Sequence, residues 1–354
     1  MRRGPKYVGL DVHQATTVAS VRQANGQVIA RTVLPTEEKA LVEFFEGLAG
    51  AVHVAFEEGT QAQWLYDLLR ERLQQVVVCD RRGQKRQGNH GDFKDADRLG
   101  EDLRTGHLRS VYHGSPERAT LRELSRLYRS LVQDATRTMQ RVKSLYRARA
   151  IRARGTGVYD AEQRGEWLAK LEERGARLRA EALLTELDLL RDLRPKAKAA
   201  LVAEARKDPA WRILRTIPFM GPVRVALLLA TMQTPWRFRT KHNLWAYAGL
   251  AVVTHSTAEW ELHEGRAVRR QRPPMTRGLN RNHNHVLKSV FKGAAEAATV
   301  RPGPLQDFYR ELLTRGLNPE LARVTLTRKL AALTLRLWKT GETFDPTKLT
   351  LQAT

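Results

Sequence analysis

The order of short apolar runs in the first eighty residues constrains the fold more than any other feature of the sequence. Three strand-like runs come first, and Gly26 provides a turn between the second and the third. Helical and strand-like patterns then alternate. The strand-like runs lie at residues 7–13, 17–21, 28–34, 52–56 and 76–79, and the helical ones at 37–48 and 61–73. This order predicts a three-stranded antiparallel meander followed by helix, strand, helix and strand.

That order of elements is the one found in the ribonuclease H-like (RuvC-like) fold, so we expect an α/β domain over residues 1–112. From Pro116 the pattern changes to long helix, with apolar and small residues at alternating spacings of three and four. The seam consists of Leu121, Leu124, Tyr128, Leu131, Ala135, Thr138, Val142 and Leu145. It predicts a coiled coil or an antiparallel helix pair, serving either as a spacer or as an oligomerisation arm.

The rest of the chain is also expected to be mainly helical. A turn near residues 155–157 separates the seam from a second helical region at 161–206, which together give a helical arm over 113–206. Residues 207–354 then form a C-terminal domain with one irregular stretch, at 251–284. The predicted architecture is therefore an α/β domain followed by mostly α-helical coiled-coil and C-terminal domains.

The charge balance points to a polyanionic partner. The chain has 61 Lys and Arg against 38 Asp and Glu, a net charge of +23, and such a surplus repels itself in a compact state. Nucleic acid is the first candidate, an anionic membrane the second, and charge that serves only solubility the third. The first long helix ends in a dense basic run that favours phosphate contact. It comprises Arg137, Arg141, Lys143, Arg147, Arg149, Arg152 and Arg154.

Cysteine usage and hydropathy narrow the class of protein. Cys79 is the only cysteine, which rules out an internal disulfide or a cysteine-rich zinc site and fits a reducing cytoplasm. No run approaches the roughly 18 apolar residues of a membrane span, and the N-terminus lacks the pattern of a signal peptide. We therefore expect a cytoplasmic, nucleoid-associated protein without a membrane partner.

Acidic side chains end two of the predicted strands. Alternation along the first strand places Gly9 and Asp11 on one face, opposite the apolar row, and alternation along the fourth does the same for Ala55 and Glu57. If the apolar rows pack on the same side, Asp11 and Glu57 converge, with small neighbours that leave room for a ligand. Glu58 falls on the other face, although alternation is less dependable at the end of a strand.

A second acidic pair follows at Asp92 and Asp95. A spacing of three puts both carboxylates on one face of a helix, where they repel each other unless a cation lies between them. Separately, Asp92 could cap the helix and Asp95 could pair with Arg98 or Lys94. Together with Asp11 and Glu57, however, they offer the hard oxygen ligands that Mg²⁺ prefers, and such a site could activate attack on a phosphodiester.

The C-terminal region holds two further motifs. Residues 217–222 are similar to a helix-hairpin-helix turn, with Phe219 in place of the usual first glycine; an ordinary helix–helix turn is the alternative. Further along, Ser256 precedes a cationic run that could offset charge on a phosphoryl group. The run consists of Arg266, Arg269, Arg270, Arg272, Arg277 and Arg281. From the residues alone, Ser256 is an ordinary loop serine.

At these motifs the chain resembles a known family, the bacterial insertion-sequence transposases of the DEDD type, which act as RNA-guided serine recombinases. The resemblance rests on residues 8–13, 56–59, 92–96 and 103–109, and on a second region at about 210–335. It implies that Asp11, Glu57, Asp92 and Asp95 are metal ligands and that Ser256 is the nucleophile. Glu58, beside Glu57, and Thr257, beside Ser256, stay open as alternatives.

The resemblance also implies partners and a mechanism. An RNA encoded by the element would pair with donor and target DNA, and a homodimer or homotetramer would join the serine of one subunit to the acidic site of another. The serine would form a covalent phosphoserine link to DNA, in the presence of Mg²⁺. Two other functions are kept: a Mg²⁺-dependent hydrolytic nuclease or Holliday-junction resolvase, and a non-catalytic nucleic-acid-binding protein.

Overall fold

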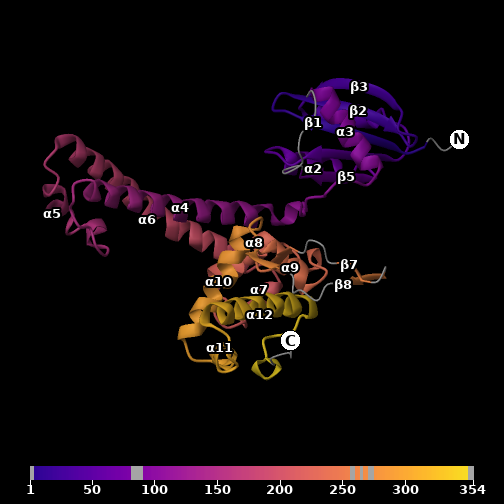
Figure 1. The fold of residues 1–354 in the computed structure, drawn as a ribbon. Helices are drawn as coiled ribbons and strands as arrows, with labels where there is room; N and C mark the ends of the chain where they lie inside the picture. The colour runs from indigo at the N-terminus through magenta and orange to yellow at the C-terminus, as the bar shows by residue number, and fades with distance from the viewer. Residues whose placement is uncertain (1–3, 81–90, 256–259, 264–265, 270–274, 350–354) are drawn as a thin grey trace. The chain divides into compact units, whose positions relative to one another are not determined.

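The computed structural model describes residues 4–80, 91–255, 260–263, 266–269 and 275–349. The chain divides into two compact units, Met1–Glu117 and Arg118–Thr354, which are described in turn (Figure 1). The division into three domains that the sequence predicts, with boundaries after residues 112 and 206, stays a prediction.

The first unit is built on a five-stranded mixed sheet in the order β3-β2-β1-β4-β5. The strands are β1 (Lys6–Val12), β2 (Thr16–Gln23), β3 (Val28–Pro35), β4 (Val52–Glu57) and β5 (Gln75–Cys79). The first three pair antiparallel, whereas β4 runs parallel to β1 and β5 parallel to β4. Each predicted strand forms, in the predicted order, and the antiparallel meander is confirmed.

One face of this sheet is covered by α1 (Glu38–Glu46) and α2 (Ala62–Leu69). Leu41 and Phe45 of α1, with Leu65 of α2, pack on the inward side chains of β1 and β4 in one buried cluster. Burial of these apolar side chains drives the packing of this layer. The second helix ends four residues before the predicted residue 73, and Arg72 and Leu73 continue it only as turns that hydrogen-bond back to Leu69.

The opposite face carries α3 (Asp92–Arg104), which lies across β1 and β2 (Figure 1). Gly9 allows this approach, because a Cβ atom at that position would lie 2.0 Å from the carbonyl oxygen of Ala96 and 2.5 Å from the backbone nitrogen of Gly100. Asp97 then anchors the helix to the sheet. Its carboxylate accepts hydrogen bonds from Ser20 at 2.5 Å and from Arg31 at 2.7 Å.

The second unit begins with a pair of long helices, α4 (Ala119–Arg147) and α6 (Arg174–Ala205), which lie side by side (Figure 1). The pair is antiparallel, since Arg118 bonds Asp208 near one end, Thr138 bonds Glu186 in the middle and Arg149 bonds Glu173 at the other. The predicted antiparallel helix pair is present; supercoiling of the two helices stays a prediction. Short elements η2 (Gly157–Tyr159) and α5 (Arg164–Ala169) lie in the connection between them.

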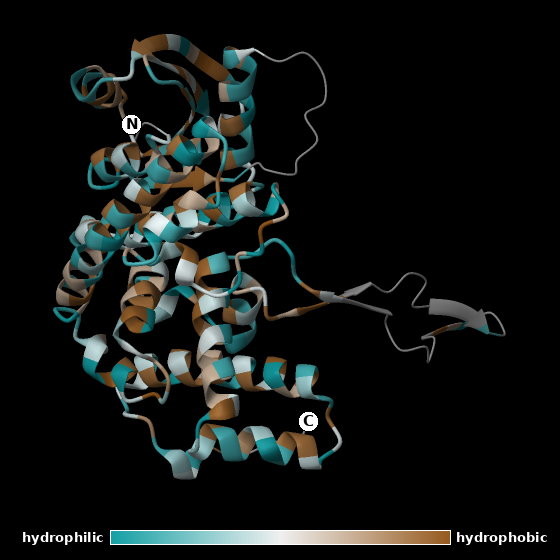
Figure 2. Cartoon of the chain, turned by 90° about the vertical axis from the view of Figure 1, so that its left-hand side faces the viewer, coloured by the Kyte–Doolittle hydropathy of each residue, from teal (hydrophilic) through white to brown (hydrophobic). Residues whose placement is uncertain are grey.

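The remaining helices pack around one large apolar cluster, which also includes Leu121 of α4 and Leu201 of α6. Apolar and polar residues alternate along most of them (Figure 2), as expected for helices with one buried face. They are α7 (Ala210–Arg215), α8 (Pro222–Met232), η3 (Pro235–Arg237), α9 (Lys241–Tyr247), α10 (His285–Val300), α11 (Pro304–Thr314), α12 (Pro319–Thr340) and η4 (Pro346–Lys348).

The stretch at 251–284 is not irregular as predicted, because two antiparallel ribbons form there. In one, β6 (Val252–His255) pairs with β9 (Met275–Leu279); in the other, β7 (Trp260–His263) pairs with β8 (Arg266–Arg269). Each strand has only four or five residues, too few for alternation to stand out among so many arginines.

Among the described residues, no helix is both long enough and apolar enough to cross a bilayer.

Candidate metal centre and nucleic-acid surfaces

Asp11 lies near the end of β1 and brings the first acidic side chain to the face that α3 covers. Its neighbour in β2 is the buried Val18, and its own side chain is 22% exposed. The Nε2 atom of His13 lies 3.3 Å from one Asp11 oxygen and 3.9 Å from an oxygen of Asp92. Ligand atoms from these three residues all lie within 4.8 Å of one another, an arrangement that could hold a metal ion.

Helix α3 supplies two more acids because it begins at this point. Asp92 and Asp95 both lie in its first turn, directly after Gly91. Carboxylates are favoured there by the helix dipole and by the free N–H groups of the first turn. Because α3 packs closely against Gly9, this contact determines where Asp92 and Asp95 lie relative to Asp11.

The pKa of Asp11 is raised above its ordinary value, and the three other predicted acids contribute to that rise. Burial raises this pKa most, His13 lowers it, and Asp92, Asp95 and Glu57 each raise it further. A partly buried carboxylate surrounded by three other acids is stabilised by added positive charge. The set of donors is composed of carboxylates and one imidazole, and hard carboxylate oxygens suit a divalent cation such as Mg²⁺.

The two adjacent glutamates at the end of β4 have different surroundings. Glu57 acts electrostatically on Asp11, whereas the carboxylate of Glu58 lies 2.7 Å from Nε2 of His113. The other ring nitrogen of His113 lies 3.1 Å from the side-chain oxygen of Gln63. Glu58 is thus engaged with a histidine, whereas Glu57 acts on Asp11; which of the two is a metal ligand stays a prediction.

His13 was not among the residues predicted for this site. It falls two positions after Asp11, so that the two side chains share a face if the strand geometry continues, and this spacing was the signal that could have identified it. Its side chain is 50% exposed. It lies close enough to both Asp11 and Asp92 to serve as a further ligand.

The predicted nucleophile, Ser256, lies outside the described residues. Its alternative, Thr257, and the cationic Arg270 and Arg272 also lie outside them. Other predicted cations of this stretch fall in or beside the ribbons. The side chains of Arg266, at the start of β8, and Arg281, after β9, are exposed; those of Arg269 and Arg277 are outside the described part.

The basic run on α4 is partly used in bonds within the arm. Arg137 pairs with Asp134, and Lys143 donates to the carbonyl oxygen of Gly155 at 2.7 Å. Arg149 pairs with Glu173 and donates to the carbonyl oxygen of Leu145 at 3.1 Å. The exposed Arg141 and Arg147 are therefore better placed than these three for an external phosphate.

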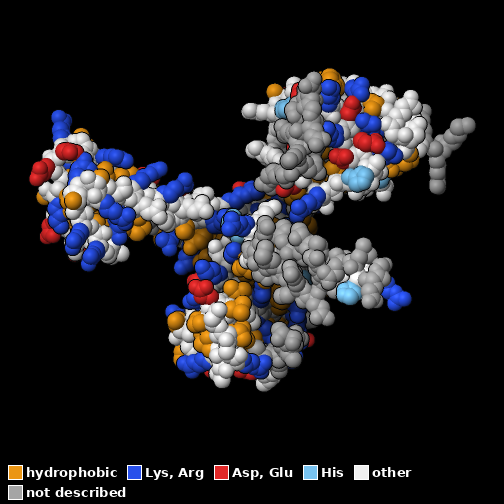
Figure 3. Space-filling model, in the orientation of Figure 1, with side chains coloured by type: hydrophobic (Ala, Val, Ile, Leu, Met, Phe, Trp, Pro, Cys, Tyr) orange, Lys and Arg blue, Asp and Glu red, His pale blue; other side chains and the backbone are white. Residues whose placement is uncertain are grey.

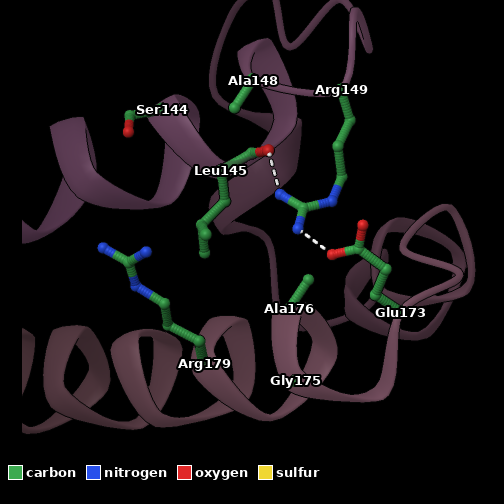
Figure 4. Close-up of a pocket in the computed structure, with 8 residues that line it drawn as sticks. All are labelled: Ser144, Leu145, Ala148, Arg149, Glu173, Gly175, Ala176 and Arg179. Atoms are coloured by element: carbon green, nitrogen blue, oxygen red, sulfur yellow. Dashed lines mark hydrogen bonds and ion pairs between the residues drawn. The ribbon is translucent and has the colours of Figure 1, made fainter.

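Arg149 also lines a cavity of about 350 Å³ between α4 and α6. Figure 4 shows its guanidinium between the two helices, with the carboxylate of Glu173 bound to it and Arg179 on the far side of Leu145. Many lysine and arginine side chains lie on the face of the arm that Figure 3 shows. The arm is therefore a basic surface, but one that carries internal ion pairs.

The predicted helix-hairpin-helix segment forms a turn between α7 and α8. Phe219 adopts a φ of 64° there, a left-handed conformation that favours glycine and is costly for an aromatic residue. Arg224 donates to the carbonyl oxygen of Phe219 at 2.8 Å, and Arg215 to that of Met220 at 2.6 Å. These bonds hold the turn in the conformation that the usual glycine would adopt more easily.

Comparison with known proteins covers both regions that carry these motifs. The sequence pattern of a family described as "Transposase", of the DEDD and IS110 type, matches residues 8–148. That of the family "Transposase IS116/IS110/IS902" matches residues 211–310. The chain belongs to the IS110-type transposases. The first match includes all four predicted acids, and the second includes Ser256.

One relative is similar over part of its length. It is the "Insertion element IS116 uncharacterized 44.8 kDa protein" of Streptomyces clavuligerus, 27% identical over 141 residues. The alignment covers 40% of this chain and 32% of the relative, so the chain matches about a third of that protein. Transposases with this DEDD domain have a RuvC-like fold, and the mixed sheet of the first unit agrees with it.

Proposed function

We propose that this protein cuts and rejoins DNA strands, using Mg²⁺ held by Asp11, Glu57, Asp92 and Asp95 together with a serine nucleophile, Ser256. One observation carries the proposal: Asp11 and Asp92 lie with His13 in one group whose ligand atoms are within 4.8 Å of one another, and Asp95 and Glu57 also act electrostatically on Asp11. Isolated acids at these positions would serve as turn or capping residues, but four acids together stabilise a cation.

Different residues of the chain bind the cation, position its ligands and bind the phosphate. The acidic cluster holds the cation, and the Gly9 contact with α3 keeps Asp92 and Asp95 in place. A bound divalent cation would neutralise charge on the phosphodiester and favour attack on phosphorus. Arginines that follow Ser256 in the sequence, such as Arg266 and Arg281, would offset negative charge on the phosphate.

Ser256 supplies the covalent step. Its Oγ atom forms a bond to phosphorus, the bond from phosphorus to one deoxyribose oxygen breaks, the serine proton leaves to a base or solvent, and the freed oxygen takes up a proton. Rejoining is the reverse reaction with the hydroxyl of another strand, which regenerates the serine. The phosphoserine link conserves the energy of the phosphodiester bond, so no external energy source is needed.

The partners proposed for this reaction are donor and target DNA and a structured guide RNA encoded by the element. The net charge of +23 supports nucleic acid as the partner. A homodimer or homotetramer would bring Ser256 of one subunit to the acidic cluster of another. Sequencing the nucleic acid that copurifies with the protein tests the RNA: one defined structured RNA supports it, and random fragments contradict it.

The covalent intermediate provides the test of the nucleophile. Labelled DNA carrying the junction of the element is incubated with protein and Mg²⁺, and the products are separated on a denaturing gel. We expect a protein–DNA adduct with wild type and with Thr257→Ala, and none with Ser256→Ala. An adduct that persists in Ser256→Ala contradicts the assignment, and hydrolysed strands without any adduct indicate a nuclease or resolvase instead.

A further inference from the structure

Trp236, in η3, is an aromatic side chain left on the surface of the second unit. It is 70% exposed, whereas its neighbour Phe238 is buried and Pro235 packs inward. Hydration of so large an apolar ring is unfavourable, and exposed aromatic rings commonly serve as contact points for a partner. The side chain therefore contributes little to the core, and its role lies outside the folding of the unit.

Positive charge is concentrated around this ring. The Nζ atom of Lys339 lies 5.4 Å from the centre of the Trp236 ring and is held there by hydrogen bonds to the carbonyl oxygens of Phe238 at 2.6 Å and Arg239 at 3.2 Å. Arg237 lies 4.4 Å from the ring centre of Tyr247. Lys339 is thus held beside the Trp236 ring by the backbone that directly follows η3.

The charged surface continues along α12, which packs against η3 and α9. Lys329 and Arg336 are seven residues apart and so share a face of α12, and Lys241 of α9 lies close enough to influence Lys329. Burial lowers the pKa of Lys329 most, and Lys241 and Arg336 lower it further. Arg336 also pairs with Glu342 at 3.4 Å.

We propose that Trp236 and the cations of α9 and α12 form a platform for single-stranded nucleic acid, on which a base stacks while the neighbouring phosphates contact the lysines. Stacking on an aromatic ring requires a base that is free of its duplex, whereas the cations need only a phosphate backbone. An exposed tryptophan beside clustered cations provides both contacts. An acidic protein would satisfy the charge but would not need a flat exposed ring.

The inference rests on the proposed function, since strand exchange opens a duplex and creates single strands that must be held. The platform would bind one such strand, from DNA or from the guide RNA, through residues of the second unit alone. It requires no metal and no serine, so its binding can be measured separately from catalysis.

Binding of a labelled single strand of about 12 nucleotides, followed by fluorescence anisotropy, tests the platform. We expect Trp236→Ala to weaken binding about tenfold or more, and Trp236→Phe to retain most of the affinity. An abasic strand of the same length should bind wild type and Trp236→Ala equally. Truncating so exposed a side chain leaves the core intact, and Trp64→Ala, at a 38% exposed tryptophan of the first unit, is the matched control.

The outcomes distinguish this inference from the proposed function. Unchanged single-strand binding in Trp236→Ala overturns the platform and points to a different partner for the ring. Equal weakening for single strand, abasic strand and duplex also overturns it, because only backbone contact would then be involved. Asp11→Asn should bind the single strand like wild type. A loss of strand exchange in that variant would therefore concern the metal site and not the platform.

Discussion

A Cβ atom on Gly9 would lie 2.0 Å from the carbonyl oxygen of Ala96, so α3 rests on β1 at a point where only glycine fits. This contact connects the fold to the acidic cluster. Asp11 lies two residues after Gly9 on the same face, and Asp92 and Asp95 lie within one turn before Ala96. The separation of the two sets of acids therefore depends on how closely the helix can approach the strand.

Replacing Gly9 tests this dependence. Gly9→Ala should destabilise the contact between β1 and α3 by about 3 kcal/mol or more, since the clash is with backbone atoms that cannot rotate away. Hydrogen exchange at the amides of β1 and α3 measures the effect locally. Gly59→Ala is the control: a Cβ there meets no described atom within 4 Å, and its exchange should match wild type. Unchanged protection in Gly9→Ala would show that the helix is not seated there.

Asp97 should be the principal polar anchor of the same helix. Asp97→Asn removes the charge that accepts hydrogen bonds from Ser20 and Arg31, and we expect a loss of about 1–3 kcal/mol. Asp102→Asn, on the same helix, is the matched control because its carboxylate makes no hydrogen bond or ion pair in the described structure. Thermal unfolding compares the two variants; equal midpoints would contradict the anchoring role.

The helix pair of the second unit provides a second matched comparison. Leu187 of α6 is 1% exposed, and Leu189, two residues later, is 59% exposed. Leu187→Ala should cost about 2–5 kcal/mol through lost burial and the cavity left behind, whereas Leu189→Ala should stay within about 0.5 kcal/mol of wild type. Denaturant unfolding followed by helical circular dichroism measures both. Similar losses in the two variants would mean that the exposed face of α6 is covered by a second subunit.

The element order of the first unit could be predicted because each strand and helix carries its own local pattern. Strand alternation also placed Asp11 opposite the apolar row and favoured Glu57 over Glu58 as a ligand, a choice that stays a prediction. Three other features could not be predicted, because they depend on distant contacts. Gly9 meets a helix almost ninety positions away in sequence, as the Ala96 contact shows; Asp97 meets Ser20 and Arg31; and the two short ribbons depend on partners across a loop.

The cation site makes a prediction that is independent of DNA. Titration calorimetry with Mg²⁺ should show that Asp11→Asn weakens binding by more than about tenfold, since it removes the most central of the four carboxylates. Glu58→Gln should bind like wild type, because that carboxylate pairs with His113. If Glu58→Gln lost the ion and Asp11→Asn kept it, the site would lie elsewhere on the unit.

The most direct measurement for the whole account is a strand-joining assay. Labelled donor and target DNA are incubated with purified protein, its copurified RNA and Mg²⁺, and recombinant strands are counted by sequencing across the new junctions. We predict joined strands with wild type and Glu58→Gln, and none with Asp92→Asn or without the divalent cation. Joined strands at the wild-type level in Asp92→Asn, or cut strands that are never rejoined by wild type, would contradict the account.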